Sequence, residues 1–208
     1  MHILGPAGKL EYEFNPGPEE ANQTFAVLCH PHPLYGGSMH DAVLRSTESK
    51  LIKHGISCIR FNFRGVGSSE GKHDNGVGEM EDLKATVSHF RALFPQKNLW
   101  TIGYSFGASV VWKTIPEIKP EKALLIAPPT KHLEFNAQEQ NQNVAAIVGD
   151  QDEFFDNSVL EKLNVQSLNI LEGGDHFFTY HHQELKNAVE EFITIKTAEE
   201  SFKKRSLQ

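Results

Sequence analysis

A serine lies between two glycines at the centre of the chain, where residues 103–107 have the sequence GYSFG. The apolar run Leu99–Tyr104 precedes this serine as an expected strand, and small residues open an expected helix after it. A serine on such a sharp strand-to-helix turn projects its hydroxyl above the sheet, where it can act as a nucleophile. The bare pattern also occurs in ordinary tight turns, so the flanking strand and helix favour the catalytic interpretation. The sequence therefore predicts Ser105 as a nucleophile.

A serine hydroxyl needs a neighbouring base, and in folds with this turn the carboxylate and the histidine follow the serine in that order. His176 follows two glycines in the sequence GGDHFF, after an expected strand at Ser167–Leu171. It is the only histidine in a strand-end loop downstream of the carboxylates. The other histidines considered lie on or beside expected helices and are interpreted as structural or solvated; they are His54, His89, His181 and His182. We therefore expect His176 to be the general base.

Three carboxylates compete for the role of orienting that base. Asp150 directly abuts the strand Val144–Val148, whereas Asp152 lies further into the loop with room to turn toward His176. Asp175 is adjacent to His176 in sequence, and neighbouring side chains usually diverge. We favour Asp152 over Asp150 and discount Asp175.

An acyl-transfer reaction also needs N–H donors for the developing oxyanion. The N–H of Phe106, directly after the serine, is the expected first donor, and the second should come from a loop after an early strand. That loop contains HPHPLYGG from His30 onward; because proline has no N–H, the possible donors are His32 and Leu34. We favour His32, and Leu34 remains open. A metal site at His30 and His32 is disfavoured because no Asp-x-His partner follows them in the sequence; no metal site is expected.

These segments together resemble the α/β-hydrolase superfamily, especially its small lidless bacterial members with a His-Pro-His-Pro-x-x-Gly-Gly loop. The resemblance spans about Lys9 to Ile195 and is carried by HPHPLYGG, RFNFRGVGSSEG, GYSFGA, GDQDEF and GGDHFF. It implies a mostly parallel twisted sheet with helices on both faces, no cap domain, a Ser105/Asp152/His176 triad, no cofactor, and ester, thioester or amide substrates. Many members have His-Gly where this chain has His-Pro, which leaves the second oxyanion donor open.

Elements that could position these residues alternate along the chain, as expected for an α/β fold with a largely parallel sheet. We expect strands at Lys9–Phe14, Thr24–His30, Ser57–Phe63, Leu99–Tyr104, Ala123–Ala127, Val144–Val148 and Ser167–Leu171. Helices are expected at Ala42–His54, Glu79–Phe94, Phe106–Ile115, Asn157–Leu163 and His182–Lys196. Only a short polar stretch separates the strands at 123–127 and 144–148, which is too short for a cap domain.

Length and composition narrow the class of protein further. With 208 residues, 39% of them hydrophobic, the chain suits one domain over residues 1–208 with a polar tail at 197–208. A net charge of −7 argues against nucleic-acid binding, because a phosphate backbone requires clustered basic residues. No signal peptide or membrane span is apparent, so we expect a cytoplasmic protein that does not bind membranes. Cys29 and Cys58 lie in apolar runs and are expected to be buried thiols.

The sequence thus predicts a serine hydrolase acting on a small-molecule acyl substrate, as a monomer or homodimer. An amidase or peptidase with the same triad is one alternative. The other is a binding protein that keeps the fold without the activity, because function lives in sites rather than folds.

Overall fold

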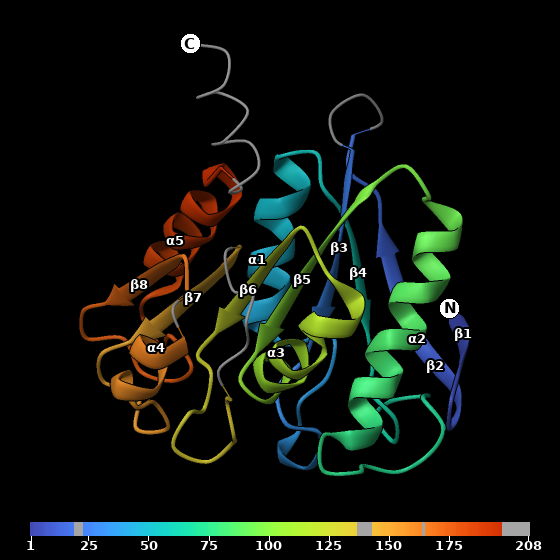
Figure 1. Cartoon of the computed structure of the whole chain (residues 1–208), viewed down its shortest axis with the longest axis horizontal. Helices are drawn as coiled ribbons and strands as arrows, with labels where there is room; N and C mark the ends of the chain where they lie inside the picture. The colour runs from blue at the N-terminus through green and yellow to red at the C-terminus, as the bar shows by residue number, and fades with distance from the viewer. Residues whose placement is uncertain (19–22, 137–142, 164, 197–208) are drawn as a thin grey trace.

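Eight strands form one sheet in the computed structural model, which describes residues 1–18, 23–136, 143–163 and 165–196 (Figure 1). The strand order across the sheet is β1-β2-β4-β3-β5-β6-β7-β8. The strands are β1 (His2–Gly5), β2 (Gly8–Asn15), β3 (Thr24–Cys29), β4 (Ser57–Phe61), β5 (Asn98–Tyr104), β6 (Lys122–Ile126), β7 (Val144–Gly149) and β8 (Ser167–Leu171). From β4 to β8 every neighbouring pair is parallel, while β1 and β2 are antiparallel at one edge. The expected mostly parallel sheet is confirmed.

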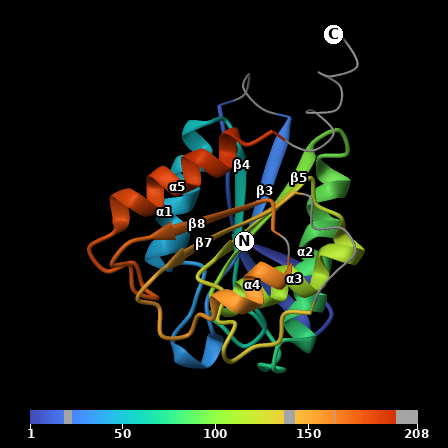
Figure 2. The same ribbon diagram turned by 60° about the vertical axis from the view of Figure 1, so that its left-hand side comes forward.

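Helices cover both faces of the sheet because the side chains of its central strands are apolar on both sides. On β3, Phe25 and Val27 join one core cluster, whereas Ala26 and Leu28 join the other. Helices α2 (Val77–Leu93), α3 (Phe106–Ile118) and α4 (Asn157–Leu163) pack on the first face, and α1 (Ala42–Lys53) and α5 (His182–Thr194) on the second. Figure 2 shows α1 and α5 on one side of the sheet and α2 and α3 on the other.

The N-terminal strand β1 was not predicted from the sequence. It has only four residues, is paired on one side alone and leaves Leu4 84% exposed, so its sequence carries no clear apolar alternation. Residues His2–Gly5 form an antiparallel hairpin with β2 across a two-residue turn. The register pairs Gly5 with Gly8.

Several predicted element ends were wrong by up to three residues. Strand β3 ends at Cys29 and β4 at Phe61, because the N–H of Phe63 donates to the ring of His30 instead of continuing the sheet. Helix α3 continues past the predicted end at Ile115 to Ile118, with Pro116 inside its last turn, where a missing N–H removes only one helical hydrogen bond. Helix α2 begins at Val77 rather than Glu79, and α5 ends at Thr194 rather than Lys196.

The segment that could carry a lid joins β6 to β7. Its described residues, 127–136 and 143, contain no helix or strand. The carboxyl end of the parallel sheet is therefore left without a cap domain in the part of the chain that the structure describes.

A buried lysine holds the end of α5 against the sheet. Lys122 is 5% exposed, and its Nζ donates to the carbonyl of Ile193 at 3.2 Å and to that of Ile195. The same Nζ lies 4.6 Å from the centre of the Trp100 ring. An ammonium beside the last carbonyls of a helix satisfies acceptors that have no partner within the helix and complements its dipole.

Replacing this lysine should therefore destabilise the protein. We expect Lys122→Met to lower the free energy of unfolding by about 2 to 3 kcal/mol, because buried carbonyls lose charged donors. Urea denaturation measures the change, and Lys113→Met, at an exposed position of α3, should stay within about 0.5 kcal/mol of the parent. Equal stability of the two variants would contradict the assigned role of Lys122.

Candidate active site

Ser105 occupies a strained turn between β5 and α3. Its backbone has φ 53° and ψ −118°, a conformation that residues other than glycine rarely adopt. Such a conformation costs about 1 to 3 kcal/mol. Gly107 follows the turn where a Cβ would lie 2.3 Å from the carbonyl oxygen of Cys29 on β3, so only glycine fits. The predicted strand-to-helix turn is present, with α3 packed closely against the sheet.

The three residues proposed from the sequence as nucleophile, base and acid meet at this turn. His176 Nε2 lies 2.9 Å from Ser105 Oγ, and His176 Nδ1 lies 2.7 Å from Asp152 Oδ2. The carboxylate can only accept, so it holds the proton on Nδ1 and leaves Nε2 free to accept from the serine hydroxyl. Both side chains of the acid and the base are nearly or fully buried, with exposed fractions of 0% for Asp152 and 8% for His176.

The two rejected carboxylates have other partners. Asp150 Oδ1 accepts the N–H of Gly173 at 2.7 Å, and Asp175 Oδ1 accepts the N–H groups of Phe177 and Thr179 at 3.1 and 2.8 Å. Each stabilises a turn of the loop that carries His176. The structure therefore brings Asp152, and neither Asp150 nor Asp175, to the ring of the histidine.

Two aromatic residues that sequence reasoning missed fix the position of His176. The hydroxyl of Tyr104 donates to the carbonyl of His176 at 3.1 Å, and the Phe154 ring centre lies 4.6 Å from that of the histidine. Burial raises the pKa of Tyr104 well above its usual value, so this hydroxyl keeps its proton. Tyr104 directly precedes the nucleophile in sequence, and Phe154 follows the acid by two residues. This closeness to the predicted site residues was the sequence signal that could have identified them.

The two possible second oxyanion donors differ in their surroundings. The N–H of Leu34 donates to Nδ1 of His32 at 3.2 Å, and the Leu34 side chain is 70% exposed. His32 itself lines the cleft above Ser105, with its ring centre 4.9 Å from that of Phe106. Leu34 does not line that cleft, and Phe106 is the first residue of α3, where N–H groups have no helical acceptor. Of the predicted donor residues, His32 and Phe106 thus line the cleft that contains Ser105.

His30 anchors the loop that carries His32. Its Nδ1 lies 2.6 Å from the carbonyl oxygen of Pro31, and its Nε2 accepts the N–H of Phe63 at 3.0 Å. Burial, as the main cause, lowers the pKa of His30 to about 4. Both ring nitrogens are thus used by the backbone. Within the described ranges, no group of three or more His, Cys, Asp or Glu side chains is arranged to hold a metal ion.

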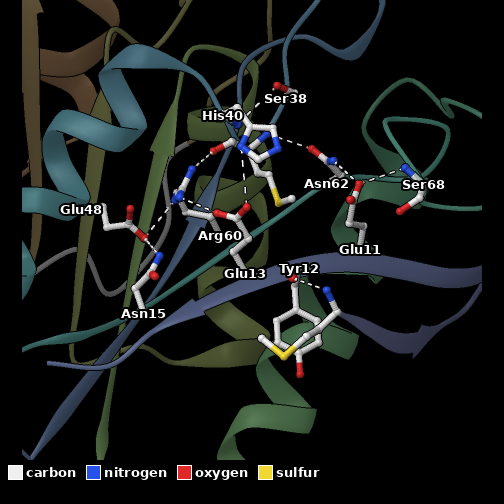
Figure 3. A network of polar contacts seen from close by, with 12 residues as sticks. Glu11, Tyr12, Glu13, Asn15, Ser38, His40, Glu48, Arg60, Asn62 and Ser68 are labelled. Atoms are coloured by element: carbon white, nitrogen blue, oxygen red, sulfur yellow. Dashed lines mark hydrogen bonds and ion pairs between the residues drawn. The ribbon is translucent and has the colours of Figure 1, made fainter.

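A second set of contacts fixes the far end of the same loop (Figure 3). The N–H of Met39 donates to Asn62 Oδ1 at 2.8 Å, and its carbonyl accepts from the guanidinium of Arg60 at 2.5 Å. Arg60 is 6% exposed and lies between Glu13 and Glu48, at 2.6 and 2.9 Å. A buried guanidinium with two carboxylate partners is a rigid support for the segment that leads into α1.

A cleft of about 680 Å³ opens over Ser105 at the carboxyl end of the sheet. Aromatic and apolar side chains form most of its wall, as in many small-molecule sites. The cleft is lined by Pro31, His32, Tyr35, Gly36, Gly37, Asp41, Tyr104, Ser105, Phe106, Pro129, His132, Leu133, Phe154, His176 and Phe177.

Fold and site geometry together define an α/β serine hydrolase. The chain belongs to the serine aminopeptidase S33 family, whose model matches residues 27–166. It is also 31% identical to the uncharacterized protein RP471 of Rickettsia prowazekii (strain Madrid E), over 95% of this chain and 90% of that protein.

No described helix is long and apolar enough to cross a membrane.

Solved structures from two other bacteria are similar over nearly the whole length. XC6422 from Xanthomonas campestris, described as an α/β serine hydrolase without a lid, superposes with a TM-score of 0.88 at 32% identity, covering 93% of this chain and 92% of that one. An α/β serine hydrolase homologue from Coxiella burnetii gives a TM-score of 0.84 at 31% identity, covering 91% and 94%. The lidless α/β-hydrolase fold is therefore shared with relatives of similar size.

The neutral state of His30 links stability to pH. The histidine pKa is 6.5 when unperturbed and about 4 in the folded protein, so the unfolded chain binds the proton first as pH falls. The contribution of neutral His30 to the free energy of unfolding is fully present above pH 6.5. It declines by about 3 kcal/mol as the pH falls toward 4. Urea unfolding at pH 7, 5.5 and 4.5 should show a shallower pH dependence for His30→Gln than for the parent.

The exposed histidine His182 provides a matched control for this test. His182→Gln should retain the pH dependence of the parent. If His30→Gln and the parent lost stability equally on acidification, the neutral bridging role of His30 would be refuted.

Proposed function

We propose that this protein cleaves small carboxylic esters or thioesters through an acyl-enzyme on Ser105, with His176 as base and Asp152 as its orienting acid. The observation that carries the proposal is the continuous set of hydrogen bonds from Asp152 through His176 to Ser105 at the floor of the cleft. The membership in a serine hydrolase family supports it. Backbone N–H groups of Phe106 and His32 are the proposed oxyanion donors.

The proposed reaction has two halves. His176 Nε2 takes the proton of Ser105 Oγ while that oxygen bonds to the substrate carbonyl carbon, and the negative charge moves to the carbonyl oxygen. When the tetrahedral intermediate collapses, the bond to the alcohol or thiol breaks and His176 returns the proton to that leaving group. Water then attacks the acyl-enzyme with the same base and releases the carboxylic acid, which restores Ser105.

Fluorophosphonate labelling tests the nucleophile and its base. Mass spectrometry should find one adduct on Ser105 in the parent protein and none in Ser105→Ala. We expect Ser105→Ala and His176→Ala to lower kcat for an activated ester by at least about a thousandfold. Asp152→Asn should cause a large loss as well, whereas Asp150→Asn should remain active because Asp150 only supports a turn.

Two outcomes would overturn this proposal. An unlabelled parent protein would favour a binding protein on the same fold. A variant pattern in which Asp150→Asn is inactive and Asp152→Asn is active would refute the assignment of the acid.

The open cleft also predicts a preference for short acyl groups. Without a lid among the described residues, the end of a long acyl chain stays in water and gains little of the ~0.8 kcal/mol that each buried methylene contributes. In a series of p-nitrophenyl esters, kcat/KM should be highest for acyl chains of about two to four carbons. A steady rise toward long chains would contradict the open-cleft argument.

An amidase or peptidase activity is the second candidate, because the matching family is described as serine aminopeptidase. The same nucleophile, base and oxyanion donors serve amide hydrolysis, in which His176 would protonate a leaving amine. Comparing p-nitroanilides with p-nitrophenyl esters of the same acyl group separates the two activities. Comparable turnover of the anilides would favour the peptidase.

A further inference from the structure

One charged side chain in the wall of the cleft has no role in the proposed reaction. Asp41 lies directly before α1 and is the only carboxylate among the lining residues; no lysine or arginine accompanies it there. His32, which also lines the cleft, has its pKa lowered by burial and by His73, so it adds no positive charge near pH 7. Among the described residues that line the cleft, no lysine or arginine balances the carboxylate of Asp41.

The contacts of Asp41 leave one of its two oxygens available. Oδ1 accepts the N–H of Val43 at 2.8 Å and that of Leu44 at 3.4 Å, which caps α1. Oδ2 has no hydrogen bond or ion pair with any described residue. Burial, as the larger effect, raises the pKa of Asp41 although these two N–H groups lower it, so the charged form is incompletely stabilised by the protein. A cation in the cleft would supply the missing stabilisation.

The position of this carboxylate is fixed rather than adaptable. The N–H of Asp41 donates to the carbonyl of Ser38 at 3.0 Å. Two residues before it, the backbone of Met39 is held by Arg60 and Asn62. A bound cation would therefore meet a preorganised carboxylate, which reduces the entropic cost of binding.

Aromatic rings form much of the remaining wall. Five of the lining residues are phenylalanine or tyrosine: Tyr35, Tyr104, Phe106, Phe154 and Phe177. The face of an aromatic ring attracts cations, and cages of such rings recognise quaternary ammonium groups. A net charge of −7 also favours the approach of a cationic substrate over an anionic one.

From these observations we infer that the cleft selects acyl substrates that carry an alkylammonium group, which binds between the Asp41 carboxylate and the aromatic wall. This inference rests on the proposed hydrolase function and specifies its substrate class. A helix cap alone does not require the charge, because serine, threonine or asparagine caps a helix as well. Helix capping therefore does not explain the negative charge of Asp41, whereas selection of a cationic substrate does.

Two pairs of esters with equal shape but different charge test the inference. Acetylcholine and 3,3-dimethylbutyl acetate place the trimethyl group on the leaving alcohol. Ethyl betaine and ethyl 3,3-dimethylbutyrate place it on the acyl side, so the two pairs show on which side of the scissile bond the ammonium group binds. For each pair, the ratio of kcat/KM for the charged ester to that for the neutral ester is compared between the parent and Asp41→Asn.

Asparagine keeps the helix cap and removes the charge. We expect Asp41→Asn to lower this ratio about tenfold for at least one pair. Comparing the two proteins cancels the difference in chemical reactivity within a pair. Glu153→Gln is the matched control: it removes an exposed charge beside Phe154 that does not line the cleft, and it should leave both ratios unchanged.

The outcomes separate this inference from the proposed function. Hydrolysis of the neutral esters with both ratios unchanged in Asp41→Asn would overturn the ammonium preference and leave the hydrolase intact. An equal fall of the ratio in Glu153→Gln would also overturn it, because the effect would then be long-range attraction. Failure to hydrolyse any of the four esters, with no label on Ser105, would overturn the proposed function and this inference together.

Discussion

The strained backbone of Ser105 is the constraint on which the arrangement of the site depends. A serine with φ 53° persists only where its surroundings hold it, and here its N–H donates to the carbonyl of Ile126 on β6 at 2.9 Å. The following helix begins against β3, where Gly107 contacts Cys29. Three neighbouring strands and one helix therefore determine where the hydroxyl lies. Its position is a property of the sheet and not of the serine side chain.

Parallel pairing brings the other site residues to the same edge. Strands β3, β5, β7 and β8 all end at the carboxyl edge of the sheet, and the loops after them carry His32, Ser105, Asp152 and His176. The acid and base loops are joined directly, since the N–H of Gln151 donates to the carbonyl of Gly174 at 2.9 Å. Residues far apart in sequence thus become neighbours because the strands before them are neighbours.

The features that could be predicted from the sequence are those that depend on local patterns of residues. Local patterns predicted the central strands and the helices, because buried parallel strands are continuous apolar runs and amphipathic helices have a clear period. The turn at Ser105 was predicted because its constraint is local and requires small residues within a few positions. The strand β1 was missed because a short, half-exposed edge strand has no such pattern.

Contacts between distant residues lay beyond the sequence. The position of Tyr104 beside the nucleophile does not reveal its hydrogen bond to the carbonyl of His176, and nothing local marks Arg60 as the support of Met39. Asp41 is recognisable in sequence as a helix cap, but its place in the cleft wall depends on how the loop from His30 folds over the sheet. The choice between Asp150 and Asp152 depended likewise on the direction in which two adjacent loops turn.

The division of the site between surface loops and the sheet has an evolutionary consequence. Much of the cleft wall belongs to loop residues at 31–41 and 129–133 and to Phe154 and Phe177, whereas Ser105 is positioned by the sheet beneath them. Substitutions in those loops can reshape the cavity without disturbing the strained turn, since the two depend on different contacts. Related chains of this architecture can therefore change the shape of the cleft while keeping the turn that positions the serine.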